Sequence, residues 1–328
     1  MYEVVSNSRN HSDVYVVVAE IDGKEKYNVI HFNKLLLDTW LDWIQHFPFF
    51  VKDFNGSVAV RLNGKENFYN VYNHNFVYDK PNNEWFDKVG TYNCKGSLVI
   101  KDNKCNILTF DGKILCDNWF DEIICDDKYH QVRMNDKWNF INGNGKLISK
   151  TWFDHVDPFY DRGGQSQAIV CLNGKYNVLN TNGKCISTKW FDGITCIAHF
   201  TRFPAKHTKG WSSYMVRMNN CDGKDISYNQ MSMNGKLLSK TWWKDVIDLQ
   251  PIGYIAVLED GRQNIITTSG IFISPDWFDR IDYEYMKNTY RTFVEYQSVK
   301  LYNENRLSKC IDYDYKQHEY VITNPKQI

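Results

Sequence analysis

The stretch YNVLNTNGKCISTKWFD, residues 176–192, decides the fold. It predicts a short strand, an Asn-Gly turn, a second strand and then Trp190-Phe191-Asp192. Variants of the same pattern recur along the whole chain, so the protein is built from repeats.

The repeats become visible when the Asn of the second strand is aligned with the motif Trp. Five of the seven Asn-to-Trp separations are 13 residues, and the other two are 12 and 15. Successive motif Trp residues are 45, 34, 33, 38, 52 and 35 residues apart. The aligned Asn residues are Asn28, Asn70, Asn106, Asn139, Asn177, Asn229 and Asn264. The motif Trp residues are, in the same order, Trp40, Trp85, Trp119, Trp152, Trp190, Trp242 and Trp277.

Each unit is expected to be an antiparallel meander of three or four short strands. Its first turn, such as Asn173-Gly174, suits a type I′ hairpin because both residues tolerate positive φ. A third short strand should then lead into Trp-Phe-Asp. In an extended segment the adjacent Trp190 and Phe191 point to opposite faces. We therefore expect one ring in the core of its own unit and the other at the joint with a neighbour.

The predicted fold is all-β: a tandem array of seven three- to four-stranded antiparallel meander repeats plus a terminal half-repeat. Residues 1–13 are expected to form an N-terminal lead-in, residues 14–305 the array, and residues 306–328 a C-terminal capping strand or tail. The surplus half-repeat and the uneven steps favour an open β-solenoid or superhelix. A closed seven-bladed β-propeller is the alternative.

The units resemble the WG-type β repeats of bacterial and phage proteins, in the variant of the form NGKYNFINxxGKLISxxWFDxV. Residues 173–192 and 138–154 carry the closest match, and the resemblance extends from about residue 14 to 305. It implies a binding or scaffold module without a shared enzyme activity. The chain departs from the pattern at Trp242-Trp243-Lys244, at Trp40-Leu41-Asp42, and at Asn75-Phe76, where Gly is expected.

Composition argues against several classes of protein. The 39 basic and 39 acidic residues balance, which argues against a nucleic-acid partner. The sequence has no apolar run long enough for a membrane span and no signal-peptide pattern. Nine cysteines without a Cys-x-x-Cys pair suggest neither a disulfide framework nor a zinc site. A cytoplasmic location is expected, with virion association as the alternative.

The recurring motif residues are expected to be structural. The Asp after Trp-Phe occurs once per unit, as at Asp192, so a turn-capping role is favoured over a hydrolase carboxylate. The seven motif Trp residues are expected in the core, and Cys125 and Cys196 occupy equivalent core positions. The sequence therefore predicts no catalytic residue, no metal site and no cofactor.

The candidate binding residues lie where the repeat is interrupted. The 52-residue step inserts a basic and aromatic segment around residues 198–211, and per-unit insertions often form the binding face. A solvated loop is the competing interpretation. The leading functional hypothesis is a non-enzymatic scaffold for a protein partner, with a phage virion, accessory or glycan-binding host-surface protein and a carboxylate-based hydrolase as alternatives. The predicted binding residues are Arg202, Lys206, His207, Lys209 and Trp211.

Overall fold

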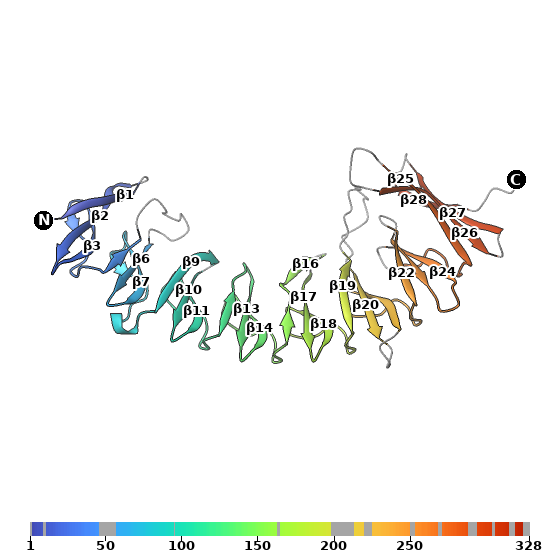
Figure 1. The fold of residues 1–328 in the computed structure, drawn as a ribbon, viewed down its shortest axis with the longest axis horizontal. Helices are drawn as coiled ribbons and strands as arrows, with labels where there is room; N and C mark the ends of the chain where they lie inside the picture. Colours follow the sequence, from blue (N-terminus) through green and yellow to red (C-terminus); the bar gives the residue numbers. More distant parts are fainter. Residues whose placement is uncertain are drawn as a thin grey trace. The chain divides into compact units, whose positions relative to one another are not determined.

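The computed structural model consists of small antiparallel β-sheets that follow one another along the chain (Figure 1). It describes residues 2–8, 11–45, 57–94, 96–162, 165–197, 213–219, 225–249, 253–267, 271–287, 294–303, 306–314 and 319–323. Within these ranges there are eight sheets and one short 3-10 helix, η2 (Asn82–Glu84). The predicted all-β repeat architecture is confirmed. No helix of the described residues is long and apolar enough to span a membrane.

The first four sheets belong to the N-terminal part of the chain. The first contains β1 (Glu3–Ser8), β2 (His11–Ile21), β3 (Lys24–His31) and β4 (Lys34–Leu35). The second contains β5 (Trp43–Ile44), β6 (Ser57–Leu62), β7 (Lys65–Asn70) and β8 (Asn75–Phe76). The third contains β9 (Lys88–Cys94), β10 (Gly96–Lys101) and β11 (Lys104–Thr109), and the fourth β12 (Glu122–Ile124), β13 (Tyr129–Met134) and β14 (Lys137–Asn142).

The last four sheets continue the pattern. The fifth contains β15 (His155–Val156), β16 (Tyr160–Arg162), β17 (Gln165–Leu172) and β18 (Lys175–Asn180), and the sixth β19 (Gly193–Ile197), β20 (Ser213–Asn219) and β21 (Ile226–Ser232). The seventh contains β22 (Asp245–Leu249), β23 (Gly253–Val257) and β24 (Gln263–Thr267). The eighth contains β25 (Arg280–Lys287), β26 (Val294–Asn303), β27 (Arg306–Asp314) and β28 (Glu319–Thr323).

Both termini contribute to sheets. Residues 1–13, expected as a lead-in, supply β1 and the start of β2, which pair with each other in the first sheet. Residues 306–328 supply β27 and β28, which extend the eighth sheet beyond β26. The chain divides into two compact units, residues 1–152 and 153–328, and each is described by itself below.

Each sheet begins at a different point of the repeat from the predicted meander. The strand that follows each motif pairs with the next hairpin, as β19 pairs with β20. The expected third strand before the motif Trp is present as the two-residue strands β4 and β8 in the first two repeats. In the fifth repeat it is reduced to isolated bridges, Leu179 to Cys185 and Tyr176 to Phe191. A sheet therefore begins after one motif, and the segment from its second turn to the next motif Trp lies beside it. We call this segment the Trp loop.

The first turn of the hairpins has the predicted geometry. Asn173 and Gly174 have φ of 52° and 74°, and the equivalent Asn63 and Gly64 have 52° and 76°. Positive φ at both central positions is the signature of a type I′ turn, whose twist matches that of the flanking strands.

A buried Asn in each repeat adds side-chain hydrogen bonds to the few backbone bonds between the Trp loop and its hairpin, such as Ile186 N–H to the Val178 carbonyl oxygen (2.8 Å). Asn177 Nδ2 donates to the carbonyl oxygens of Ser187 (2.9 Å) and Lys189 (3.0 Å), while its Oδ1 accepts from the Val178 N–H (2.8 Å). One carboxamide thus contributes three hydrogen bonds beside the backbone bonds of this junction. The corresponding residues are at most 1 % exposed, and they are Asn28, Asn67, Asn106, Asn139, Asn177, Asn229 and Asn264.

In the second repeat the sequence alignment, which placed Asn70 at the buried Asn position, is wrong. The buried Asn there is Asn67, which donates to the carbonyl oxygen of Tyr78 (2.9 Å). Asn70 instead accepts from the N–H groups of Tyr72 and Asn73 in the following turn. The longer turn and helix η2 enlarge this Trp loop, so the alignment on spacing chose the wrong Asn.

The motif aromatics fill the joints between successive sheets. Phe191 packs with Val178 of the fifth sheet, Val216 of the sixth sheet and Trp242 of the next motif. The Phe191 and Trp242 ring centroids are 6.4 Å apart, as are those of Phe86 and Trp119 in the other unit. The residue after the motif Trp is at most 1 % exposed in every repeat, and this set is Leu41, Phe86, Phe120, Phe153, Phe191, Trp243 and Phe278.

The Trp and the residue after it thus serve opposite faces of a sheet. Trp119 packs in the joint between the second and third sheets, whereas Phe120 packs in the joint between the third and fourth. The prediction of opposite faces is confirmed. The expected core within a single unit is wrong, because these clusters combine residues of two successive sheets.

The motif Trp residues are less buried than the sequence analysis predicted. Only Trp85 belongs to the fully buried core, at 2 % exposed. Its ring packs on Phe76 of the enlarged Trp loop, with centroids 4.7 Å apart, and its indole N–H donates to the Lys80 carbonyl oxygen (2.9 Å). The other six are half-buried, which corrects the prediction of a core position for Trp40, Trp119, Trp152, Trp190, Trp242 and Trp277.

Trp152 and Trp277 show how a half-buried motif Trp contributes to packing. Trp152 lies against the buried cluster between the third and fourth sheets. Trp277 lies against the cluster between the sixth and seventh sheets, with its ring centroid 5.6 Å from that of Phe272. In each motif the residue after the Trp is the fully buried one. The Trp indole covers the margin of a joint and keeps one side in solvent.

Candidate functional site

The motif Asp links each of the first five repeats to the next hairpin. Asp192 Oδ2 accepts from the N–H of Asn219 (2.9 Å), and its Oδ1 accepts from Lys175 Nζ (2.5 Å). The Lys175 ammonium, followed by the Asn219 N–H, lowers the pKa of the Asp192 carboxyl. Other copies accept from the equivalent turn N–H, through the pairs Asp42–Asn63, Asp87–Asp102, Asp121–Asn135 and Asp154–Asn173.

These contacts confirm the capping role and refine it, because the capped turn belongs to the following repeat. The sixth repeat lacks the Asp, and the next hairpin differs accordingly. Its turn carries its own ion pair between Arg262 and Asp260 (2.7 Å), and Asp260 Oδ1 accepts from the Arg262 N–H. The substitution by Lys244 therefore coincides with a turn that caps itself.

The other end of the hairpins carries the second turns, which pack against the preceding Trp loop. Gly145, with φ of 74°, lies so close to the carbonyl oxygen of Leu115 that a Cβ would come within 1.9 Å of it. Gly235 meets the Ile186 carbonyl in the same way, also at 1.9 Å. The turn Gly is thus required by the neighbouring repeat as well as by its own backbone.

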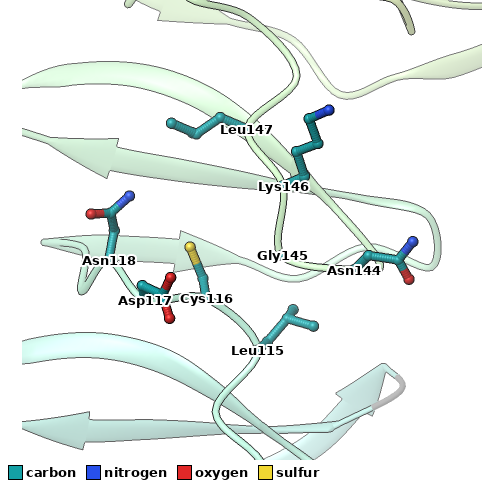
Figure 2. A pocket seen from close by; sticks show the side chains of 8 residues that line it. All are labelled: Leu115, Cys116, Asp117, Asn118, Asn144, Gly145, Lys146 and Leu147. Atoms are coloured by element: carbon teal, nitrogen blue, oxygen red, sulfur yellow. The ribbon is translucent and has the colours of Figure 1, made fainter.

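An open notch of about 330 Å³ lies where the second turn of the fourth repeat meets the Trp loop of the third (Figure 2). Asp117 and Lys146 are exposed on its two walls, while Cys116 is only 8 % exposed. The buried Asn106 fixes one wall by donating to the carbonyl oxygens of Cys116 (2.7 Å) and Asn118 (2.9 Å).

Exposed aromatic rings mark the second turns of the first three repeats. Phe32 is 68 % exposed, Tyr72 39 % and Phe110 43 %. The same turns in the fourth and fifth repeats have Gly143 and Thr181 at the equivalent position. We call Phe32, Tyr72 and Phe110 the aromatic row. Exposed aromatic rings are enriched where proteins contact partners.

The aromatic row was missed by the sequence analysis, although a signal was present. Its members lie four or five positions after the buried Asn of their repeat. The same position is Gly143, Thr181 and Met233 in the next three repeats, so an aromatic ring stands out once the buried Asn is correctly aligned.

The predicted binding residues of the long insertion lie outside the described residues. This holds for Arg202, Lys206, His207, Lys209 and Trp211. By contrast, Cys125 and Cys196 are partly buried and pack against the joints of their units. Their equivalence is confirmed, and the expected core position is corrected to the margin of a joint.

Comparisons with known proteins leave the family open. No protein-family model matches the chain, and no curated protein sequence is similar to it. Among solved structures, Kluyveromyces lactis Hsv2 is similar at 11 % identity and a TM-score of 0.27, over 84 % of this chain and 95 % of that one. BBS1N in complex with ARL6DN gives 13 % identity and a TM-score of 0.23 over 83 % and 94 %. At TM-scores this low, neither similarity decides between an open and a closed array.

Proposed function

We propose that the chain is a non-enzymatic scaffold that binds a protein partner through the second turns of its first three repeats. The observation that carries this proposal is the aromatic row, three exposed rings on three successive repeats. Aromatic anchors beside polar, solvent-accessible residues are typical of protein interfaces. Asp117 and Lys146 in the neighbouring notch would supply that polar rim.

The hydrogen bonds and ion pairs of the motif Asp residues support a scaffold over a hydrolase. A glycosidase needs two carboxyl groups aimed at one substrate bond. Here Asp42, Asp87, Asp121 and Asp192 each bind a Lys and a backbone N–H. Their recurrence once per repeat follows from this linking role.

We further propose that the repeats form an open WG-type array. Support comes from the seven motif copies and from the joints, which residues of successive repeats make within each unit. Distance measurements between spin labels on β2 and β26, near Val16 and Val294, test it. A long separation is expected, and a separation typical of neighbouring strands would replace the open array with a propeller.

The partner proposal is tested by capture from the native host followed by quantitative comparison of variants. Phe32→Ser combined with Phe110→Ser should reduce recovery of a specific partner at least about tenfold, since central aromatic anchors dominate binding energy. Tyr160→Ser is the matched control, because Tyr160 is 51 % exposed but lies outside the second turns. Equal recovery with the double variant and the control would exclude the aromatic row.

A glycan ligand is the second candidate, because the same rings offer flat apolar faces to a sugar. A glycan array probed with the wild type and the double variant separates the two. We propose a cytoplasmic location for the scaffold, with a virion or host-surface role as the alternative. Neighbouring genes that encode virion proteins would support the alternative.

A further inference from the structure

Two histidines from successive repeats meet at the second turns of the N-terminal unit. His31 Nδ1 lies 3.3 Å from His74 Nε2, and the two rings are nearly perpendicular, at 89°. His31 closes the strand before the first repeat's turn, and His74 lies in the turn of the second repeat. The contact plays no part in the core clusters of this unit.

The spacing of the two nitrogens suits a bound metal ion. Imidazole nitrogens bind Zn²⁺ at 2.0–2.1 Å, so two of them in a tetrahedral arrangement lie about 3.3–3.4 Å apart. In that arrangement each of the two nitrogens directs its lone pair at the ion. The ring protons then belong on the remote nitrogens, His31 Nε2 and His74 Nδ1.

The backbone at His74 provides an independent observation. Its φ is 53°, in the left-handed region that favours glycine. The equivalent closing residue of the second turn is Gly112, Gly145, Gly183 and Gly235 in the next four repeats, with φ from 74° to 79°. The second repeat thus carries an imidazole where its neighbours have the residue that fits the backbone best. Strained positions of this kind cluster at functional sites.

The first repeat also has a non-glycine residue with positive φ, next to His31. Phe32 has φ of 47°, an uncommon conformation for an aromatic residue. Its ring stacks on His31 with centroids 4.2 Å apart, although the side chain is 68 % exposed. The stacking holds the His31 ring in place, as supporting contacts do for metal ligands.

We propose that His31 and His74 form a binding site for a divalent transition-metal cation of the Zn²⁺ class. Water completes the coordination, since no three potential ligands converge among the described residues. The ion joins the second turn of the first repeat to that of the second. This departs from the sequence-based prediction of no metal site, and it does not depend on the proposed protein partner.

The test is titration of the purified, reduced full-length chain with Zn²⁺ in a calorimeter, together with thermal melting at each Zn²⁺ concentration. The decisive variant is His74→Gly, which removes the imidazole and supplies the residue that suits φ of 53°. Its melting temperature without metal should therefore equal or exceed that of the wild type. His31→Ala removes the other ligand.

Zn²⁺ binding should weaken at least about tenfold in both variants, and the Zn²⁺-dependent rise in melting temperature should shrink in parallel. His155→Ala is the matched control, because His155 is also exposed but pairs with Asp157 at 3.1 Å. It should bind as the wild type does. Zn²⁺ binding that persists unchanged in His74→Gly and His31→Ala, or that is absent from the wild type, would overturn the proposal.

Discussion

Replacing Phe191 by Ala should loosen one joint and leave distant repeats intact. The ring is fully buried between the fifth and sixth sheets, in contact with residues of both and with Trp242. Removing a fully buried Phe typically costs about 3–5 kcal/mol, through lost transfer energy and the cavity that remains. In a repeat array this cost falls on the two sheets that share the joint, because stability is a sum of local and nearest-neighbour contributions.

Hydrogen exchange read by mass spectrometry is the suitable assay, because an array need not unfold in one step. The opening free energy of amides in β18 and β20 should fall by about 3–5 kcal/mol, or to their detection limit. Amides in β2 and β3 should be unaffected. Thr188→Ala, an exposed change in the same Trp loop, is the control. A loss below about 1 kcal/mol in β18 and β20, or an equal loss in β2, would refute the joint model.

Three further predictions concern the contacts that join the repeats. Asp192→Asn should lower the free energy of unfolding by up to about 1 kcal/mol at pH 7. The difference should vanish as pH falls through the folded-state pKa of Asp192, which lies below the ordinary value, because the wild-type carboxyl then also becomes neutral. Chemical denaturation at several pH values measures it. Gly145→Ala should destabilise more than Gly174→Ala, since both have φ of 74° but only Gly145 faces a carbonyl, at 1.9 Å; thermal melting compares them, and equal losses would contradict the steric role. Asn177→Ala should cost about 2–4 kcal/mol by leaving the Ser187 and Lys189 carbonyls without their donor, and exchange in the fifth sheet should report it.

The sequence sufficed for those features that repeat. The hairpin turn at Asn173-Gly174 and the opposed Trp190 and Phe191 follow from φ preference and strand alternation. Capping by Asp192 was predicted because one carboxylate per repeat suits a turn better than catalysis. The structure adds that the capped N–H, on Asn219, belongs to the next repeat.

Other features were beyond the sequence for physical reasons. The expected third strand is a two-residue strand in the first two repeats and only isolated bridges in the fifth, where the Asn177 side chain adds hydrogen bonds to the segment. Such side-chain bonds leave no periodic pattern in the sequence. Asn70 was aligned in place of Asn67 because spacing cannot distinguish a buried amide from one that caps a turn. His31 and His74 are 43 positions apart, so their meeting depends on the stacking of repeats.

Burial of the motif Trp was overpredicted because recurrence was equated with a core position. Strand alternation places two adjacent large rings on opposite faces, but it does not say which of them is fully enclosed. A Trp side chain is so large that it is seldom fully buried, even where most of it packs. Trp152 and Trp277 follow this rule, and Trp85 escapes it because its Trp loop is longer.

The contact of the motif Asp with the following repeat has a consequence for the evolution of repeat number. Because Asp192 belongs to one repeat and Asn219 to the next, each of the first five copies carries a carboxylate that accepts from an N–H of the following copy. Unequal recombination that duplicates or removes a whole repeat joins matching halves. Among these repeats, copy number is therefore free to vary while the Asp junction is preserved.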